Sequence, residues 1–242
     1  MTEIKVISRP KLKNPVMLAG LPGIGNIGKV SVEYLIYKLG GKVFAELYSE
    51  YMPEWTVLEN GVLRTLKINF SYARPKGSER DIIFITSDAQ ANAPLGQYVV
   101  TGEVLDFAKK MGVDTVGAMA AYVVPAKGQY ARVVGAASDP ETKKMLERSG
   151  VRLLDGGTIV GMNGLLPALA PMYGMKGFCL LGTTKGEIID INASKAVLTV
   201  LSSMLNFELD VSELIQYSDL SKLTMQIPKQ AAAPEEELGY IR

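Results

Sequence analysis

The chain has 242 residues, of which 48% are hydrophobic and 21% are charged, and its 26 basic and 25 acidic side chains leave a formal net charge of +1. That balance excludes a dedicated binder of nucleic acid or of an anionic membrane, because such proteins gather a basic surplus on one face. Histidine is absent and there is one cysteine, which excludes a His-based triad, a His-ligated zinc site and an intrachain disulfide.

Targeting and membrane segments are not expected. The first 15 residues are charged and lack the apolar core of a secretory signal. The most apolar region, residues 159–181, is interrupted by prolines, an asparagine and a lysine, so it falls short of the roughly 20 apolar residues that a membrane span needs. The sequence therefore predicts a cytoplasmic protein. Cys179 lies in an apolar segment, which predicts a buried, inert thiol.

Short apolar runs alternate with amphipathic segments along the chain, which predicts an α/β fold. The expected strands are residues 16–21, 43–48, 62–70, 81–86, 115–120 and 177–181, and residues 50–77 are expected to include a hairpin insertion. The expected helices run from 27 to the glycine pair at 40–41, over 94–111, from a cap at Ser138 or Asp139 to 148, from Asn192 or Ser194 to about 207, and over 211–217.

The segment LPGIGNIGKV, residues 21–30, matches two phosphate-binding patterns between a predicted strand and helix. As a Walker loop it fails at Val30, which stands where a Ser or Thr would hold magnesium. As a dinucleotide loop it lacks a well-placed ribose acid, since Glu46 lies inside the second strand and Glu50 follows it.

Two interpretations of this loop stay open. The glycines can serve a tight turn and close packing of helix on strand. Alternatively, backbone amides and a lysine at a helix N-terminus can hold an anion. The residues of this possible anion or ligand site are Gly23, Gly25, Asn26, Gly28 and Lys29, joined by Asp88 and Asn163 from two later turns.

Those later turns follow other predicted strands, at the edge where open α/β sheets bind ligands. Asp88, Gln90 and Asn92 can make polar contacts there or cap the next helix, and Asn163 or Thr158 can cap another. Together the turns predict a crevice. No catalytic residue, metal ligand or cofactor is assigned in it, because no base and nucleophile are evident.

The chain is expected to form one domain, residues 1–227, followed by a flexible tail, residues 228–242, which holds a proline and an acidic run. The single tryptophan, Trp55, lies in the expected insertion. It either belongs to an exposed aromatic cluster that anchors a partner or is buried at the base of the hairpin.

Three blocks of sequence resemble the archaeal branch of the proteasome assembly chaperone 2 family. They are residues 20–35 with the glycine loop, 158–166 (TIVGMNGLL) and 190–198 (DINASKAVL), and they occur in the family's order. The resemblance implies a phosphorylase-like, three-layer α/β/α sandwich with a mainly parallel central sheet. It also implies self-association into homo-oligomers and binding to proteasome α-subunits or the 20S α-ring.

Relatives that dock by their tails end in hydrophobic-Tyr-X. Here the end is Leu238, Gly239, Tyr240, Ile241 and Arg242, so the tyrosine is third from last and a glycine precedes it. The motif is near but not met. The tail is either a partner-binding arm, carried by Leu238, Tyr240, Ile241 and Arg242, or an end with an incidental tyrosine.

The leading hypothesis is an oligomeric, non-catalytic protein that binds proteasome α-subunits or the 20S α-ring in assembly or activation, without nucleic acid, membrane or cofactor. The alternative is a nucleotide- or phosphate-binding enzyme that uses the glycine loop. A third possibility is a purely structural ring with another client.

Overall fold

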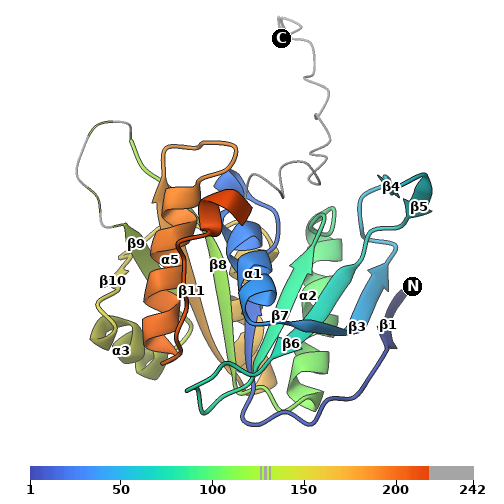
Figure 1. The fold of residues 1–242 in the computed structure, drawn as a ribbon, viewed down its shortest axis with the longest axis horizontal. Coiled ribbons are helices and arrows are strands. Elements are labelled where there is room, and N and C mark those ends of the chain that lie inside the picture. The colour runs from blue at the N-terminus through green and yellow to red at the C-terminus, as the bar shows by residue number, and fades with distance from the viewer. Residues whose placement is uncertain (126, 128–129, 131, 218–242) are drawn as a thin grey trace, which may run out of the picture.

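A mixed nine-stranded sheet forms the centre of the computed structural model, which describes residues 1–217 except 126, 128, 129 and 131 (Figure 1). In spatial order the strands are β1 (Thr2–Val6), β3 (Lys42–Ser49), β6 (Ile68–Ala73), β7 (Ile82–Ser87), β2 (Val16–Ala19), β8 (Thr115–Val123), β11 (Lys176–Thr184), β9 (Val133–Ala137) and β10 (Arg152–Leu153). The four central strands, β7, β2, β8 and β11, run parallel. The strands β1, β3 and β6 pair antiparallel on one side, and β9 pairs antiparallel with β11 on the other.

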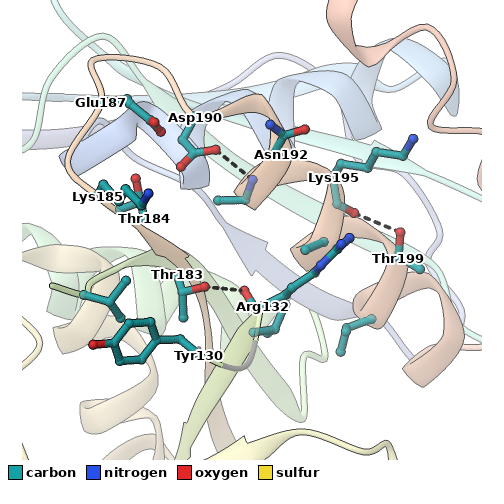
Figure 2. A pocket seen from close by; sticks show the side chains of 15 residues that line it. Tyr130, Arg132, Thr183, Thr184, Lys185, Glu187, Asp190, Asn192, Lys195 and Thr199 are labelled. Atoms are coloured by element: carbon teal, nitrogen blue, oxygen red, sulfur yellow. Dashed lines mark hydrogen bonds between the residues drawn. The ribbon is translucent and has the colours of Figure 1, made fainter. Parts of the chain in front are cut away.

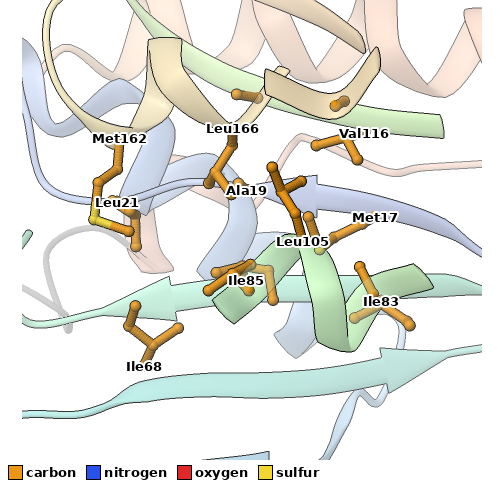
Figure 3. Packing of buried hydrophobic residues seen from close by; sticks show 14 of the residues in the cluster. Met17, Ala19, Leu21, Ile68, Ile83, Ile85, Leu105, Val116, Met162 and Leu166 are labelled. Atoms are coloured by element: carbon orange, nitrogen blue, oxygen red, sulfur yellow. The ribbon is translucent and has the colours of Figure 1, made fainter. Parts of the chain in front are cut away.

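Helices cover both faces of this sheet. One face carries α1 (Ile27–Lys38), α3 (Pro140–Arg148) and α5 (Ile191–Met204), and the other carries α2 (Pro94–Lys110) and α4 (Met162–Leu169). The alternation of side chains along a strand decides which layer each one joins. In β2, Val16 and Leu18 pack with α1 and α5, whereas Met17 and Ala19 pack with α2 and α4 (Figure 3).

The predicted α/β/α class is therefore confirmed, with a sheet that is parallel at its centre and antiparallel beside it. The likeness to phosphorylases stays a prediction. Within the described residues, the expected insertion contains a small separate hairpin of β4 (Val57–Glu59) and β5 (Val62–Arg64). The boundary expected at residue 227 lies outside the described residues.

Several predicted elements differ in extent from those observed, and two of the differences have a visible cause. The strand expected over 62–70 divides into β5 and β6, because β5 pairs with β4 alone while Leu66, between them, is buried against Met52 and Ala89. The helix expected from Asn192 or Ser194 begins at Ile191, since the carboxylate of Asp190 accepts a hydrogen bond from the Ala193 amide at 2.9 Å.

The structure also settles two side chains. Trp55 packs half-buried beside Met52 and Leu66, so of the two interpretations of this residue the buried hairpin base is the one found. Cys179 is buried, as predicted, and burial raises its pKa to about 12, which disfavours the reactive thiolate. Among the described residues, no helix combines the length and apolarity that crossing a bilayer requires.

Candidate functional site

The glycine loop joins β2 to α1 as a short 3-10 turn, residues Ile24–Asn26. Gly25 (φ +64°) and Asn26 (φ +46°) adopt the left-handed region that the turn needs. The helix that follows lies very close to the sheet: a Cβ on Gly28 would stand 2.2 Å from the carbonyl oxygen of Met119 in β8. The glycines therefore provide the tight turn and close packing that formed one of the two interpretations of the sequence.

Lys29 does not project over the loop as a phosphate-binding lysine must. Its Nζ donates to the carbonyl oxygen of Ser87, at the end of β7, at 2.8 Å, and it forms an ion pair with Glu33 at 2.7 Å. The side chain is only 10% exposed. Because its charge and its donors are already engaged beneath the loop, Lys29 ties α1 to the central sheet.

Asn163 lies in the crevice, where both the oxygen and the nitrogen of its side-chain amide bond to the backbone of the glycine loop. Its Oδ1 accepts from the Leu21 amide, and its Nδ2 donates to the Leu21 carbonyl, both at 3.0 Å. The prediction that Asn163 or Thr158 caps α4 was wrong, since the N-cap is Gly161. Asn163 instead joins the first turn of α4 to the glycine loop across 142 residues of sequence.

Gln90 makes a second connection between the same loops. Its Nε2 donates to the carbonyl of Pro22 at 2.6 Å, and its Oε1 accepts from the amide of Met162 at 2.7 Å. It thereby supplies an acceptor for one of the amides at the start of α4 that have no partner within the helix. The helix α2 has Ala93 at its N-cap and no side-chain cap, so the capping alternative for Asp88, Gln90 and Asn92 is not what the structure has.

The structure places Asp88 away from the loop glycines. Its carboxylate accepts a hydrogen bond from Arg64 of the β4–β5 hairpin at 2.6 Å. Glu46, one of the ribose candidates, is likewise engaged, by Lys67 at 2.5 Å and by the Tyr48 hydroxyl at 2.7 Å. These bonds hold the pKa of the Glu46 carboxyl below its usual value, with the Lys67 hydrogen bond the largest cause.

Two acidic residues, Glu187 and Asp190, lie beside the turn of the glycine loop. The amide of Asp190 donates to the carbonyl of Gly25 at 2.9 Å, and Asn26 Nδ2 donates to the carbonyl of Ile188 at 3.4 Å. Burial alone would raise the pKa of Asp190, but hydrogen bonds from the Ala193 amide, Thr184 and Glu187 lower it. The hydrogen bond with Asp190 is the largest cause of a raised pKa at Glu187. This negative charge opposes anion binding at the loop.

The predicted crevice exists at the carboxyl edge of β2, β8 and β11, with a volume of about 450 Å³. Its wall is mostly apolar or backbone: Leu21, Gly23, Ile24, Gly28, Gln90, Ala120, Ala121, Tyr122, Val123, Ala136, residues 154–160, Asn163 and Leu181. Of the predicted site residues, Gly23, Gly28 and Asn163 thus meet here. The other four do not line the crevice: Gly25, Asn26, Lys29 and Asp88. The polar amides in it are already used, so the crevice suits apolar groups better than a phosphate, and the anion site stays a prediction.

A model of the PAC2 family matches residues 17–231. The chain belongs to the PAC2 family. This PAC2 protein is 30% identical over its full length to an uncharacterized protein of Methanocaldococcus jannaschii, 99% of which is covered.

Two solved structures from Pyrococcus furiosus share the fold of this PAC2 protein. PbaB, an archaeal proteasome activator, superposes with a TM-score of 0.83 at 32% identity, over 93% of this chain and 97% of the other. PbaA, an archaeal homolog of proteasome-assembly chaperone, has a TM-score of 0.76 at 24% identity, over 93% and 95% of the two chains. The family resemblance seen in the sequence is thereby confirmed.

The last described residues of this PAC2 protein, 210–217, pack against α1. Tyr217 stacks on Tyr37 with ring centroids 5.2 Å apart and meets Tyr34 edge-on at 5.5 Å. Lys38 forms ion pairs with Glu213 at 3.0 Å and Asp210 at 3.7 Å. The predicted partner-binding residues Leu238, Tyr240, Ile241 and Arg242 lie outside the described residues, but the point from which their segment starts is fixed.

Sequence reasoning missed this anchor, and it also missed a second, polar groove lined by Arg132, Lys185 and Lys195. The three cations are far apart in the sequence and sit in no motif. A tyrosine three residues after another on a predicted helix was the one available signal of the anchor, since Tyr34 and Tyr37 share a helix face.

Proposed function

We propose that this protein is an oligomeric, non-catalytic partner of the 20S proteasome, which binds proteasome α-subunits or the assembled α-ring in the cytoplasm and acts in assembly or activation. The observation that carries the proposal is the similarity over nearly the whole length to P. furiosus PbaB, an archaeal proteasome activator, at 32% identity. The superposition covers 93% of this chain and 97% of the PbaB chain.

The site chemistry supports a binding role. The polar side chains of the crevice hold loops together, and the one thiol is buried with a pKa raised to about 12. An apolar crevice with exposed Ile24, Tyr122 and Val123 at its edge offers contact area to a protein. The tail adds an aromatic end group, Tyr240, on a linker that starts at the Tyr217 anchor.

The experiment is capture of the cognate 20S proteasome, and separately of free α-subunits, on the immobilised full chain. The peptidase activity of the 20S particle is measured in parallel with a short fluorogenic peptide. We expect retention of the 20S particle or the α-subunits, and light scattering is expected to give a homo-oligomer. The absence of retention of either form by the full chain would remove the proposal.

Tail variants separate the role of the tail from the role of the domain. Tyr240→Ala is compared with Lys229→Ala, a matched change in the same segment that leaves the terminal residues intact. Loss of capture with Tyr240→Ala alone assigns docking to the end of the tail. Equal capture by both variants means that the domain carries the contact, and the tail prediction is then wrong.

A further inference from the structure

A second groove lies between α5 and the ends of β9 and β11, with a volume of about 840 Å³ (Figure 2). Arg132 directly precedes β9, Lys185 directly follows β11, and Lys195 lies on the second turn of α5. Figure 2 shows Arg132 extending from the strand side toward Lys195 and Thr199 of the helix. The groove thus receives cations from three separate elements.

In the part of the chain that the structure describes, Arg132, Lys185 and Lys195 are exposed and form no ion pair. Lys185 nevertheless lies near enough to Glu187 to oppose the rise that Asp190 causes in the pKa of that carboxyl. The two carboxylates of the groove, Glu187 and Asp190, are bonded to each other and to the start of α5. They lie at the end of the groove nearest that helix terminus (Figure 2). The length of the groove beyond them is positive and attracts an anionic group.

The groove has the layout of a peptide site rather than of an ion site. Its lining combines four buried or half-buried apolar side chains with three exposed cations; the apolar residues are Val124, Val133, Ala196 and Val200. The hydroxyl of Thr199 donates to the Lys195 carbonyl at 2.9 Å, so it is already engaged. Apolar and basic side chains in one groove fit an extended segment that carries carboxylates together with an apolar side chain.

We propose that this groove receives the acidic stretch of the chain's own C-terminal segment, residues 235–237. The sequence there is Pro234, three glutamates and Leu238, so three consecutive negative charges can meet three cations and a leucine is available for the apolar residues of the lining. Residues 218–242 contain one other acidic side chain, Asp219, which lies only two positions beyond the anchored Tyr217. The glutamate run is therefore the segment of this chain whose charge and reach fit the groove.

The length of chain permits this docking within one molecule. Tyr217 is held in the same apolar cluster that contains the buried face of α5. Glu235 follows it by 18 residues, which span about 60 Å when extended and roughly 23 Å as a flexible coil. The helix α5, which forms one wall of the groove, is about 21 Å long. The glutamates reach the groove without stretching the segment.

Docking in this groove would hold Tyr240 close to α5 and away from a partner. That consequence rests on the proposed function, whereas the docking itself does not. Because the contact consists of exposed charges, each pair contributes little and salt weakens all of them. The docked segment is thus in equilibrium with a free one, and ionic strength sets the balance between them.

The test is zero-length carbodiimide cross-linking of the full chain without any proteasome, which joins carboxylates to amines that are in contact. An equal mixture of ¹⁵N-labelled and unlabelled protein distinguishes a cross-link within one chain from one between copies. Tryptic peptides are identified by mass spectrometry. We expect residues 235–237 to be joined to Lys185 or Lys195 of the same chain, and not to Lys143 or Lys144, which are exposed on α3.

Variants and salt concentration test whether the cross-links depend on the charges of the groove. Arg132→Glu removes a cation that cannot itself be cross-linked, and we expect it to lower the yield about fivefold or more. The matched control Lys143→Glu, on α3, leaves the yield unchanged. Raising NaCl from about 0.05 M to about 0.5 M, which shortens the Debye length roughly threefold, also lowers it.

Three results overturn the proposal. They are an even spread of cross-links that includes Lys143 and Lys144, a yield that Arg132→Glu leaves intact, and cross-links at the groove found only between copies. Thermal midpoints of the variants are compared with that of the parent chain, and Arg132→Gln replaces Arg132→Glu if the charge reversal prevents folding. Since no proteasome is present, these results are independent of the proteasome capture experiment.

Discussion

Replacing Gly28 with alanine would force α1 and β8 apart. The added Cβ would lie 2.2 Å from the carbonyl oxygen of Met119 and 3.1 Å from its carbon. An unstrained carbon–oxygen contact is about 3.4 Å, so the two backbones must separate by roughly 1 Å. Neither atom belongs to a flexible side chain that can turn away, because Met119 presents its main chain here.

The size of the effect follows from two opposing terms. Overpacking of a core costs about 1–3 kcal/mol, and the upper part of that range applies because backbone must move. Alanine regains up to about 1 kcal/mol through its higher helix propensity. The free energy of unfolding should therefore fall by about 2 kcal/mol. For a domain of this size that lowers the melting temperature by about 4–8 °C.

Urea and thermal unfolding of the full chain, followed by circular dichroism, measure this loss. The matched control is Gly23→Ala in the same loop: Gly23 is extended, and its added Cβ would meet nothing nearer than the Asn163 Nδ2 at 3.9 Å. That variant should stay within about 0.5 kcal/mol of the parent. If Gly28→Ala matched the parent in stability while Gly23→Ala lost several degrees, the packing explanation of this loop would be wrong.

Further predictions concern single side chains. Asn163→Ala leaves the buried Leu21 amide and carbonyl without partners and should cost about 2–4 kcal/mol in urea unfolding, whereas an exposed change such as Lys144→Ala should cost under 0.5. For Asp139, burial alone would raise the pKa, but hydrogen bonds from Thr142 and the Glu141 amide lower it below 3.8. The stability that the Asp139 carboxylate contributes is therefore complete above about pH 3.8 and is lost as the pH falls through the lower pKa of the folded state. Asp139→Ala should accordingly lower the free energy of unfolding by about 1 kcal/mol at neutral pH and leave it unchanged in acid. Millimolar phosphate or ATP with magnesium should shift the melting temperature by less than about 1 °C, because Lys29 is already paired with Glu33; a shift that grows with ligand concentration and is abolished by Lys29→Met would restore the nucleotide hypothesis.

Local patterns in the sequence determined the elements of this fold. Apolar runs such as residues 82–87, fully buried in β7, predict a strand with helices on both faces, since alternate side chains enter opposite layers. The Asp139–Pro140 pair marked the start of α3 for a local reason, a carboxylate cap two and three residues before its amides. The strands β1, β9 and β10 were not predicted. The strand β1 is a charged edge strand, β9 has a glycine and two alanines that disfavour a strand after its two valines, and β10 has only two residues.

Tertiary structure alone decided what the polar side chains do. The sequence placed Lys29 and Asn163 in a ligand crevice, but their partners, Ser87 and Leu21, are 58 and 142 residues away in the chain. Arg132, Lys185 and Lys195 meet in one groove because β9 and β11 are neighbours in the sheet and α5 packs across them. A side chain's periodicity is set by its own backbone, whereas its partners are set by which elements pack together, and that pairing is fixed only when the whole core forms.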